Sequence, residues 1–338
     1  MRYRASLSCA TTDRTRPSVR AVIVNYRTSE MVIDCLASLE AERDGSATLD
    51  VVVVDNASGD HSLELIEGAV AANGWEDWVT LVASVENRGF AAGNNIVLLD
   101  DQLPKPDYFW LLNPDTYARP GALAGLLEVM ASQPRAGLVG SCLEWPDGVQ
   151  QHSMFRFHTL GTEFFSTLAV GPFTRLFDTF NVALAPKRET ARFDWLSGAS
   201  LLVRAAVIDE IGGMDENYFL YFEETDFCLR AQQAGWDCWL AQQSRVVHLV
   251  GQSTGVTARE RGSRRRPDYW FQSRRRYFEK HHGRFYADLA DFALGTNVLM
   301  NRVIAFVRRK PSQMPDRFLL DLVTHGLGRR WHMRKAHR

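Results

Sequence analysis

Two apolar runs near the N-terminus decide the fold: residues 19–25 read VRAVIVN and residues 50–55 read DVVVVD. A continuous apolar run of this length is typical of a strand covered on both faces of its sheet. Between the two runs, residues 29–43 place apolar side chains at helical spacing. A strand, a helix and a second strand in this order form a βαβ unit, in which the strands are parallel. The sequence therefore predicts an α/β fold.

Strands and helices continue to alternate along the next part of the chain. Further strands are predicted at residues 79–82 and 108–112, and helices at 62–73, from Phe90 onward and at 121–132. Alternation of this kind is typical of a doubly wound, Rossmann-like domain with a mostly parallel sheet flanked by helices.

The pattern then becomes less regular. Residues 137–143 and 200–203 have the composition of strands, whereas residues 145–194 carry many aromatic side chains without a clear period. Toward the C-terminus, apolar residues recur at helical spacing among many arginines, with stretches at 285–292 and 298–307. This part of the sequence predicts a basic helical extension.

Charge is distributed unevenly along the 338 residues, although the formal net charge is only -1. Residues 1–255 have a balance of -14, and residues 256–338 have a balance of +13. The near-neutral total therefore hides a dipolar chain. We divide the chain into a flexible N-terminal segment at 1–18, a catalytic α/β domain at 19–255 and the basic helical region that follows.

The apolar stretches, the N-terminus and the cysteines of the sequence also indicate the cellular compartment in which the protein is expected. A membrane span needs roughly 18 uncharged apolar residues, and the best stretch, 289–307, contains Asp291 and Arg302. The Arg- and Thr-rich N-terminus does not resemble a secretory signal. Five scattered cysteines lack the C-x-x-C spacing of zinc or redox sites. We therefore expect a cytoplasmic protein with buried, reduced thiols.

Polar side chains follow three of the predicted strands at the point where each strand ends. The first strand runs into Asn25 and Tyr26, the second into Asp55, and the fourth into Asn113 and Asp115. A single Asp at a strand end is usually a turn former or a helix cap. In open parallel sheets, however, ligands bind beyond the carboxyl ends of the strands, so three such ends indicate a binding site.

The sequence lacks both G-x-G-x-x-G after the first strand and a Walker A motif, which argues against a dinucleotide dehydrogenase and a P-loop NTPase. Residues 86–95 instead read ENRGFAAGNN, a glycine-containing turn that enters a helix beside Arg88. A helix N-terminus next to a guanidinium suits a pyrophosphate. A plain loop with two turn glycines is an equal alternative.

The most unusual segment is residues 221–226, YFEETD, just before an apolar helix predicted at 227–234. Its carboxylates could simply favour the helix macrodipole. Because aromatic residues surround them, burial would raise a carboxyl pKa toward the range of a general base. His248 follows two valines, and a lone histidine is more often a core or surface residue than a ligand.

These segments, in this order, resemble the family 2 glycosyltransferases of the inverting type, and most closely the bacterial rhamnosyltransferase-like members. The resemblance covers about residues 19–255 and implies a GT-A fold, a nucleotide-diphosphate sugar donor and a divalent metal, Mg²⁺ or Mn²⁺. It rests on these runs: AVIVNY at 21–26, VVDNAS at 53–58, NRGFAAGNN at 87–95, LNPD at 112–115, SGA at 197–199, and EETD at 223–226 followed by AGW at 234–236.

The resemblance implies a role for each matching residue on the donor side. Asn25, Tyr26 and Asp55 look like the nucleoside pocket, with Asp55 accepting the N–H of the base. Arg88 lies where the family contacts the nucleotide. Gly198 would allow close approach to the donor phosphates or the acceptor, because a side chain would block the cleft.

The metal position departs from the family pattern. Asp115 looks like the metal carboxylate, and the family's Asp-x-Asp reads Asn113-Pro114-Asp115 here, so the first ligand is a weak amide oxygen or none. His248 stands at the family's late metal-histidine position. Metal binding with one carboxylate is expected to be loose.

On the acceptor side, Glu224 stands where the family usually has the Asp that deprotonates the acceptor hydroxyl. This role implies a single in-line displacement with inversion at the anomeric carbon. Glu223 would orient the same loop beside the acceptor. Asp194 and Trp195 would contact the acceptor sugar, with a turn Asp and a core Trp as the equal alternative.

We therefore expect an inverting glycosyltransferase that moves L-rhamnose from dTDP-rhamnose, or another dTDP- or UDP-linked sugar, to a cell-surface glycan or lipid-linked acceptor. Arginine clusters at 264–266, 274–276 and 308–310 suit a peripheral anionic membrane surface at the inner face better than nucleic acid. A solvated basic face is the alternative.

Two other functions stay open at this point. A sugar-phosphate nucleotidyltransferase has a similar sheet, but it would need a glycine-rich basic loop after the first strand, where residues 25–28 have no glycine. The second is an inactive GT-A binding module, which would not need to retain Asp115 and Glu224. Asn113, in place of the first Asp of the family's Asp-x-Asp, keeps this alternative open.

Overall fold

The computed structural model describes residues 16–43, 45–165, 178–187, 189–250, 265–309, 314–315 and 317–325. The chain forms two compact units. Unit 1 joins residues 1–157 to 183–258, and unit 2 joins residues 158–182 to 259–338. Residues 158–182, which we placed in the catalytic domain from the sequence, thus group with the C-terminal helices. Most of the segment at 1–18 lies outside the described residues.

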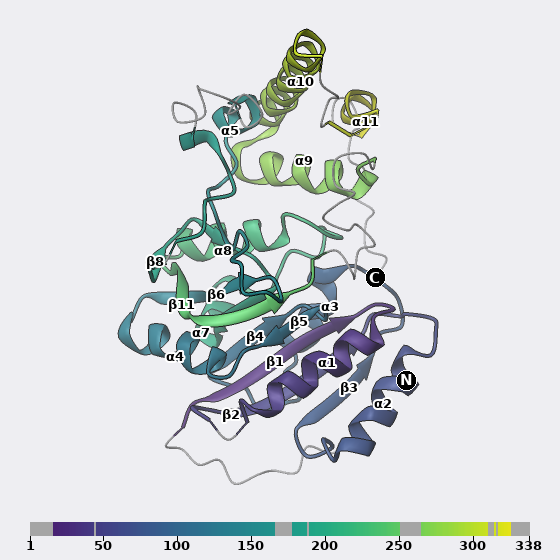
Figure 1. Ribbon diagram of the computed structural model, residues 1–338, viewed down its shortest axis with the longest axis vertical. Coiled ribbons are helices and arrows are strands. Elements are labelled where there is room, and N and C mark those ends of the chain that lie inside the picture. The colour runs from purple at the N-terminus through teal and green to yellow at the C-terminus, as the bar shows by residue number, and fades with distance from the viewer. Residues whose placement is uncertain are drawn as a thin grey trace. The chain divides into compact units, whose positions relative to one another are not determined.

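The N-terminal half of the unit 1 sheet is parallel (Figure 1). Its strands are β1 (Ser18–Asn25), β2 (Thr48–Asp55), β3 (Val79–Ala83) and β4 (Tyr108–Leu112), in the order β3-β2-β1-β4. β1 and β2 have continuous buried runs, as their unbroken apolar sequence predicts. The predicted βαβ arrangement is therefore confirmed.

The other half of the sheet is mixed. β10 (Ser200–Arg204) is antiparallel to both β4 and β6 (Ala136–Glu144), and β6 is parallel to β11 (Asp237–His248). β5 (Thr116–Ala118) and β8 (Ala191–Arg192) are antiparallel to β11. The sequence predicted β6 and β10 but not β11. A short antiparallel pair, β7 (Met154–Phe155) and β9 (Trp195–Leu196), forms a second sheet.

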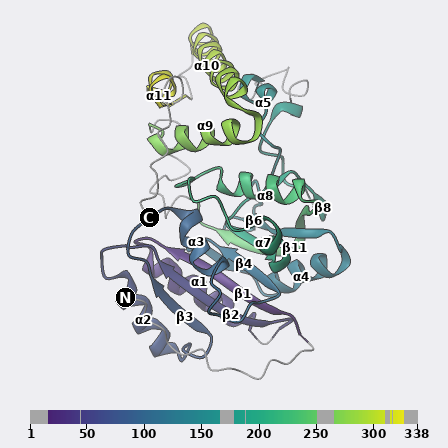
Figure 2. The same cartoon turned by 180° about the vertical axis from the view of Figure 1, so that it is seen from behind.

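Helices cover both faces of the large sheet, and Figures 1 and 2 show it from opposite sides. In β1, Ala21 and Ile23 face one core, and Val22 faces the other, because side chains alternate along a strand. The first core contains α1 (Ser29–Glu40), α2 (Ser62–Asn73) and α4 (Ala122–Ser132); the second contains α3 (Phe90–Leu98), α7 (Ala205–Ile211) and α8 (Glu223–Gln233).

Unit 2 is helical. It contains α5 (Leu160–Phe165), a short 3-10 helix η2 (Asp178–Phe180), α9 (Asp268–His282), α10 (Arg284–Val307) and α11 (Phe318–His325). The two apolar stretches expected separately near the C-terminus belong to one continuous helix, α10. No helix in the described part of the chain is long and apolar enough to cross a membrane.

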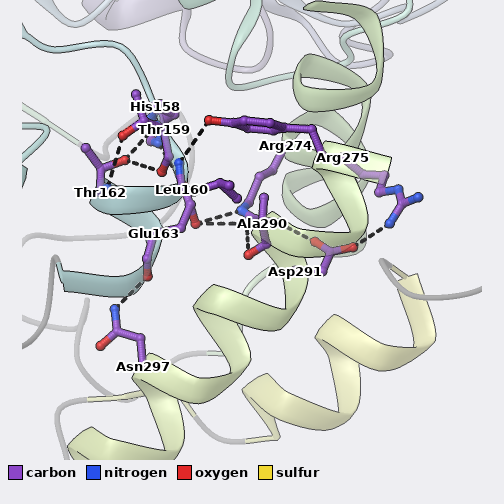
Figure 3. A network of polar contacts seen from close by, with 11 residues as sticks. His158, Thr159, Leu160, Thr162, Glu163, Arg274, Arg275, Ala290, Asp291 and Asn297 are labelled. Carbon is purple, nitrogen blue, oxygen red and sulfur yellow. Dashed lines mark hydrogen bonds and ion pairs between the residues drawn. The ribbon is translucent and has the colours of Figure 1, made fainter. Parts of the chain in front are cut away.

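A buried ion-pair network links three helices of unit 2 (Figure 3). The Arg274 guanidinium donates to Glu163 Oε2 at 2.8 Å and also pairs with Asp291. Arg275 pairs with the second oxygen of Asp291 at 2.7 Å and with Glu279 at 2.8 Å. The expectation that this arginine cluster faces a membrane is therefore wrong for Arg274 and Arg275, which are buried beside carboxylates.

Candidate active site

The carboxyl ends of β1 and β2 lie side by side, since Asn25 and Asp55 are register partners. The Asn25 side-chain amide donates to Asp55 Oδ1 at 2.7 Å, and the Ser58 hydroxyl donates to the same oxygen at 2.5 Å. The Ser58 backbone N–H donates to Oδ2 at 3.2 Å. These bonds fix the buried Asp55 carboxylate, and its oxygens retain acceptor capacity for a ligand.

Beside this carboxylate, Tyr26 presents its ring at the surface. The Arg27 guanidinium lies 5.1 Å from the ring centroid, and its Nε donates to the Ser58 carbonyl at 2.9 Å. Arg27 has a left-handed backbone, with φ 59°. The sequence did not indicate Arg27 as part of this end of the sheet, because its contact depends on the turn after β2.

The turn before α3 is held to the loop before α8. Gly89 has φ 92°, and a Cβ at this position would lie 2.0 Å from the Phe219 carbonyl oxygen, so only glycine fits. The Phe90 N–H donates to that same carbonyl at 3.0 Å. Arg88 pairs with Glu216 at 2.7 Å. One N–H of the helix start is thus already used, which weakens the interpretation of this turn as a pyrophosphate cradle.

Asp115 and His248 meet where β4 and β11 end and β5 begins. His248 is the register partner of Thr116, and its Nε2 lies 3.5 Å from Asp115 Oδ1. Asp115 is 1% exposed, and neither carboxylate oxygen receives a hydrogen bond from the described residues. A buried carboxylate without donors is costly unless a cation compensates it. The position therefore fits a divalent metal.

The remaining ligands of such a metal would have to come from elsewhere. Within the described part of the chain, no group of three or more His, Cys, Asp or Glu side chains is placed to hold a metal ion. The Asn113 backbone is fixed, since its N–H donates to the Ala199 carbonyl at 3.0 Å and its carbonyl accepts from Thr116 Oγ1 at 2.7 Å. A metal here would depend on the phosphate oxygens of a bound nucleotide.

α8 begins with two adjacent carboxyl groups. The preceding residues, Tyr221 and Phe222, have left-handed φ angles of 71° and 68°, a conformation that such residues rarely adopt outside functional sites. Helix α8 starts at Glu223, four residues before the helix predicted from the sequence. The first turn of the helix therefore carries Glu223 and Glu224, and its backbone N–H groups favour their charged forms.

Burial changes the protonation of this pair. Burial, and then the charge of Glu224, raise the pKa of Glu223 well above its usual value. Burial also raises the pKa of Glu224, opposed by backbone N–H groups, including that of Gly198, and by a hydrogen bond from Glu223. The pair therefore holds its proton on Glu223, and Glu224 Oε2 has no hydrogen-bond partner among the described residues.

Gly198 lies directly against this carboxylate. A Cβ built at Gly198 would lie 3.8 Å from Glu224 Oε1 and 3.7 Å from the Phe90 ring. These are ordinary contact distances, so the contacts within the chain do not by themselves require glycine here. Through Ala199, the same loop joins Asn113 at the end of β4. The predicted residues Asn113, Gly198 and Glu224 thus belong to one connected edge.

Asp226, in the same first turn of α8, has a different role. It is fully buried, and its Oδ2 accepts from Arg230 Nε at 2.8 Å. Arg230 in turn donates to the carbonyls of Ile211 and Gly213, each at 2.8 Å. Asp226 therefore anchors the loop before α8.

Asp194 and Trp195 have contacts within unit 1 that account for their side chains. Asp194 Oδ2 accepts the Phe157 N–H at 2.9 Å. The Trp195 indole donates to the Arg156 carbonyl at 2.8 Å and stacks on Phe155 with centroids 4.1 Å apart. These contacts agree with the structural alternative, and an acceptor role for the two residues stays a prediction.

A mixed α/β sheet with helices on both faces and the predicted polar residues at its carboxyl edge agrees with the expected GT-A fold. Residues 17–266 match the family described as glycosyltransferase like family 2. The chain belongs to this family, and the resemblance seen in its sequence is confirmed.

The chain is also similar to curated rhamnosyltransferases. It is 32% identical over 157 residues to N-acetylglucosaminyl-diphospho-decaprenol L-rhamnosyltransferase of Mycobacterium tuberculosis, covering 44% of this chain and 49% of that protein. It is 28% identical over 171 residues to rhamnosyltransferase WbbL of Escherichia coli, covering 48% and 61%. The chain thus matches only about half the length of these relatives.

Two solved structures confirm the predicted GT-A fold. A mannosyltransferase of Pyrobaculum calidifontis in complex with GDP-Man and Mn²⁺ has a TM-score of 0.54 and 16% identity, covering 86% of this chain and 76% of that one. GalNAc-T7 with UDP, GalNAc and Mn²⁺ has a TM-score of 0.58 and 14% identity, covering 93% and 59%. At this level of identity the similarity concerns the fold alone.

Proposed function

We propose that this protein is an inverting, metal-dependent glycosyltransferase that moves L-rhamnose from dTDP-rhamnose to a hydroxyl of a cell-surface glycan or lipid-linked acceptor. It would act in the cytoplasm, at the inner face of the cell membrane. The observation that carries the proposal is the buried Glu223–Glu224 pair beside Gly198, in a family 2 chain. The two rhamnosyltransferase relatives support the sugar, and the decaprenol-linked substrate in one relative's name supports the acceptor.

The donor nucleotide would bind at the ends of β1 and β2. The fixed Asp55 carboxylate can accept an N–H of the base, and the exposed Tyr26 ring can stack against it. Arg88, whose guanidinium is exposed, would leave the half-buried Glu216 to reach the nucleotide phosphates, and Glu216 would keep its hydrogen bond from Asn95.

Asp115 and His248 would hold the metal, with Asn113 beside them. A divalent cation there supplies positive charge that stabilises the departing diphosphate. Asp115 is suited to this role because its two buried oxygens have no other donor among the described residues. Burial would also keep competing water away from the carboxylate.

Glu224 would act as the general base. The acceptor oxygen forms a bond to the anomeric carbon while the bond from that carbon to the diphosphate oxygen breaks on the opposite side. The hydroxyl proton passes to Glu224 Oε2, the oxygen without a partner. A raised pKa makes Glu224 a stronger base, and the neutral Glu223 beside it limits charge repulsion in the pair.

The test is transfer by the purified protein from dTDP-rhamnose, with other nucleotide sugars as comparison, and NMR of the product to read the anomeric configuration. Glu224→Gln should bind donor normally, measured as thermal stabilisation, and lose about 10²–10⁴-fold in turnover. Asp226→Asn changes the other carboxylate of the same helical turn, which anchors α8 through Arg230. Its turnover shows how much activity is lost through structural damage to α8 alone. Turnover of Glu224→Gln within a few-fold of the parent would remove Glu224 as the base, and a retained configuration would exclude inversion.

A further inference from the structure

An exposed apolar stripe runs along α10. Its members recur at intervals of four, three, seven, four and three residues, so they share one side of the helix. The three phenylalanines are 71–85% exposed. We call the following set the α10 stripe: Phe285, Leu289, Phe292, Leu299, Val303 and Phe306.

The other side of α10 is buried inside unit 2. Ala287, Ala290, Leu294 and Val298 lie in the interior, and the ion pairs of Asp291 fix the helix against α9. α10 thus already buries a separate apolar face inside unit 2, and the α10 stripe is an additional apolar face on its exposed side. Large exposed apolar patches on a folded unit mark interaction surfaces.

The exposed charges around the stripe are almost all positive. Arg284 precedes the stripe, Arg302 lies beside it, and Arg308 and Arg309 follow it, all of them exposed. The exposed acid of α10, Asp288, pairs with Arg275 at 2.7 Å. We call the four exposed arginines the α10 rim.

We propose that the α10 stripe and rim together dock on an anionic lipid surface. The phenylalanines would enter the boundary between headgroups and acyl chains, and the rim arginines would contact lipid phosphates. A second copy of the chain fits less well, because a symmetric pairing of two stripes would bring two cationic rims together. This proposal rests on the membrane location given under the proposed function, but not on the transfer reaction.

The test is sedimentation of the full chain with vesicles of equal parts phosphatidylglycerol and phosphatidylcholine, with phosphatidylcholine vesicles as the neutral control. The stripe variant, Phe285→Ser/Phe292→Ser/Phe306→Ser, should bind anionic vesicles at least about tenfold more weakly. The rim variant, Arg302→Gln/Arg308→Gln/Arg309→Gln, should lose about 100-fold, at about fivefold per arginine, and should lose most of the salt dependence.

The matched control is Leu65→Ser/Val85→Ser, which removes exposed apolar side chains of unit 1 and should bind like the parent. Circular dichroism and thermal unfolding should be unchanged in every variant, because the substituted side chains are exposed. Glu224→Gln should bind vesicles normally, and the stripe variant should still act on a water-soluble acceptor. Failure of lipid docking is thereby separated from failure of the transferase proposal.

Equal vesicle binding by the parent and the stripe variant would overturn the proposal. So would equal binding of the parent to anionic and neutral vesicles at every salt concentration. Light scattering provides the remaining outcome: a dimeric parent and a monomeric stripe variant, with vesicle binding unchanged, would assign the stripe to a second copy of the chain instead.

Discussion

Buried carboxyl groups occur at the start of α8 in unit 1 and between α5, α9 and α10 in unit 2. Their pKa values are shifted in opposite directions in the two places. In unit 2, burial by itself would raise the pKa of Glu163, but the Arg274 charge and a hydrogen bond with His158 outweigh it and hold the pKa below its usual value. At the start of α8, no arginine or lysine of the described residues pairs with Glu223 or Glu224, and burial raises both pKa values.

The difference shows which buried carboxylates serve structure and which are suited to chemistry. An arginine that is itself buried turns a carboxylate into a fixed structural ion with little tendency to take a proton. Without that arginine, the same burial raises the pKa of the carboxyl group, so that it accepts a proton more readily, as a general base must. Asp115 is a separate case, because its buried oxygens have neither arginine nor hydrogen-bond donor among the described residues, which leaves them available to a metal cation.

The largest effect on stability should come from removing the arginine of the unit 2 network, so that its carboxylates are buried without that cation, as Glu223 and Glu224 are at the start of α8. Arg274→Met would keep the size of the side chain but leave Glu163 and Asp291 buried beside fewer positive charges. We expect a loss of about 3–5 kcal/mol in the free energy of unfolding of unit 2. Urea unfolding followed by hydrogen exchange of the α9 and α10 amides would measure it.

The control for this prediction is Arg302→Gln, an exposed arginine of the same unit, which should change stability by less than about 0.5 kcal/mol. The triple variant Arg274→Met/Glu163→Gln/Asp291→Asn should recover a large part of the loss, since no uncompensated charge remains. A loss in Arg274→Met no greater than in the control would mean that the network contributes little.

The second prediction concerns Asp115 as the proposed carboxylate ligand of the metal. Asp115→Ala should abolish the thermal stabilisation that Mn²⁺ gives together with donor nucleotide, and reduce donor affinity by roughly tenfold or more. Without metal, the variant should be at least as stable as the parent, because a buried charge without donors is removed. Metal-dependent stabilisation that survives in Asp115→Ala would place the metal elsewhere.

Sequence patterns predicted the parallel half of the sheet well because each strand there is determined locally. The unbroken runs in β1 and β2 and the polar residues after them identified both the strands and the edge where Asn25 and Asp55 meet. β11 was missed because Gln242 and Gln243 interrupt its apolar pattern, and its pairing with β6 shifts register between Ala241 and Arg245. Strand pairing of that kind depends on distant partners.

The unit 2 network could not be predicted for the same reason. Arg274 lies in a run of three arginines, which favours an exposed basic surface when the sequence is taken alone. Its partner Glu163 lies 111 residues earlier, in a segment whose sequence has no clear period. The start of α8 was the reverse case: local sequence indicated the carboxylates, but only the fold shows that Gly198 lies against Glu224.

The smallest effect we expect is in Glu223→Gln, which sharpens the comparison through pH. A carboxyl whose folded-state pKa is raised contributes stability that is complete below its ordinary pKa and is lost as pH rises through the raised value. The amide cannot ionise, so the parent should lose stability relative to Glu223→Gln with rising pH, by at most about 1.4 kcal/mol per pH unit. Turnover should stay within a few-fold, because the amide can still donate to Glu224 as the protonated carboxyl does.

Glu163 should show the opposite sign, because its folded-state pKa is lowered. Its contribution to stability is present above its ordinary pKa and is lost as pH falls through the lowered value. Urea midpoints of the parent, Glu223→Gln and Glu163→Gln between about pH 3 and pH 9 cover both ranges. The Glu223 difference should grow toward high pH, and the Glu163 difference should shrink toward low pH. Parallel curves for all three proteins would show that the two places hold their carboxyl groups in the same way, and the assignment of one to structure and the other to proton transfer would fail.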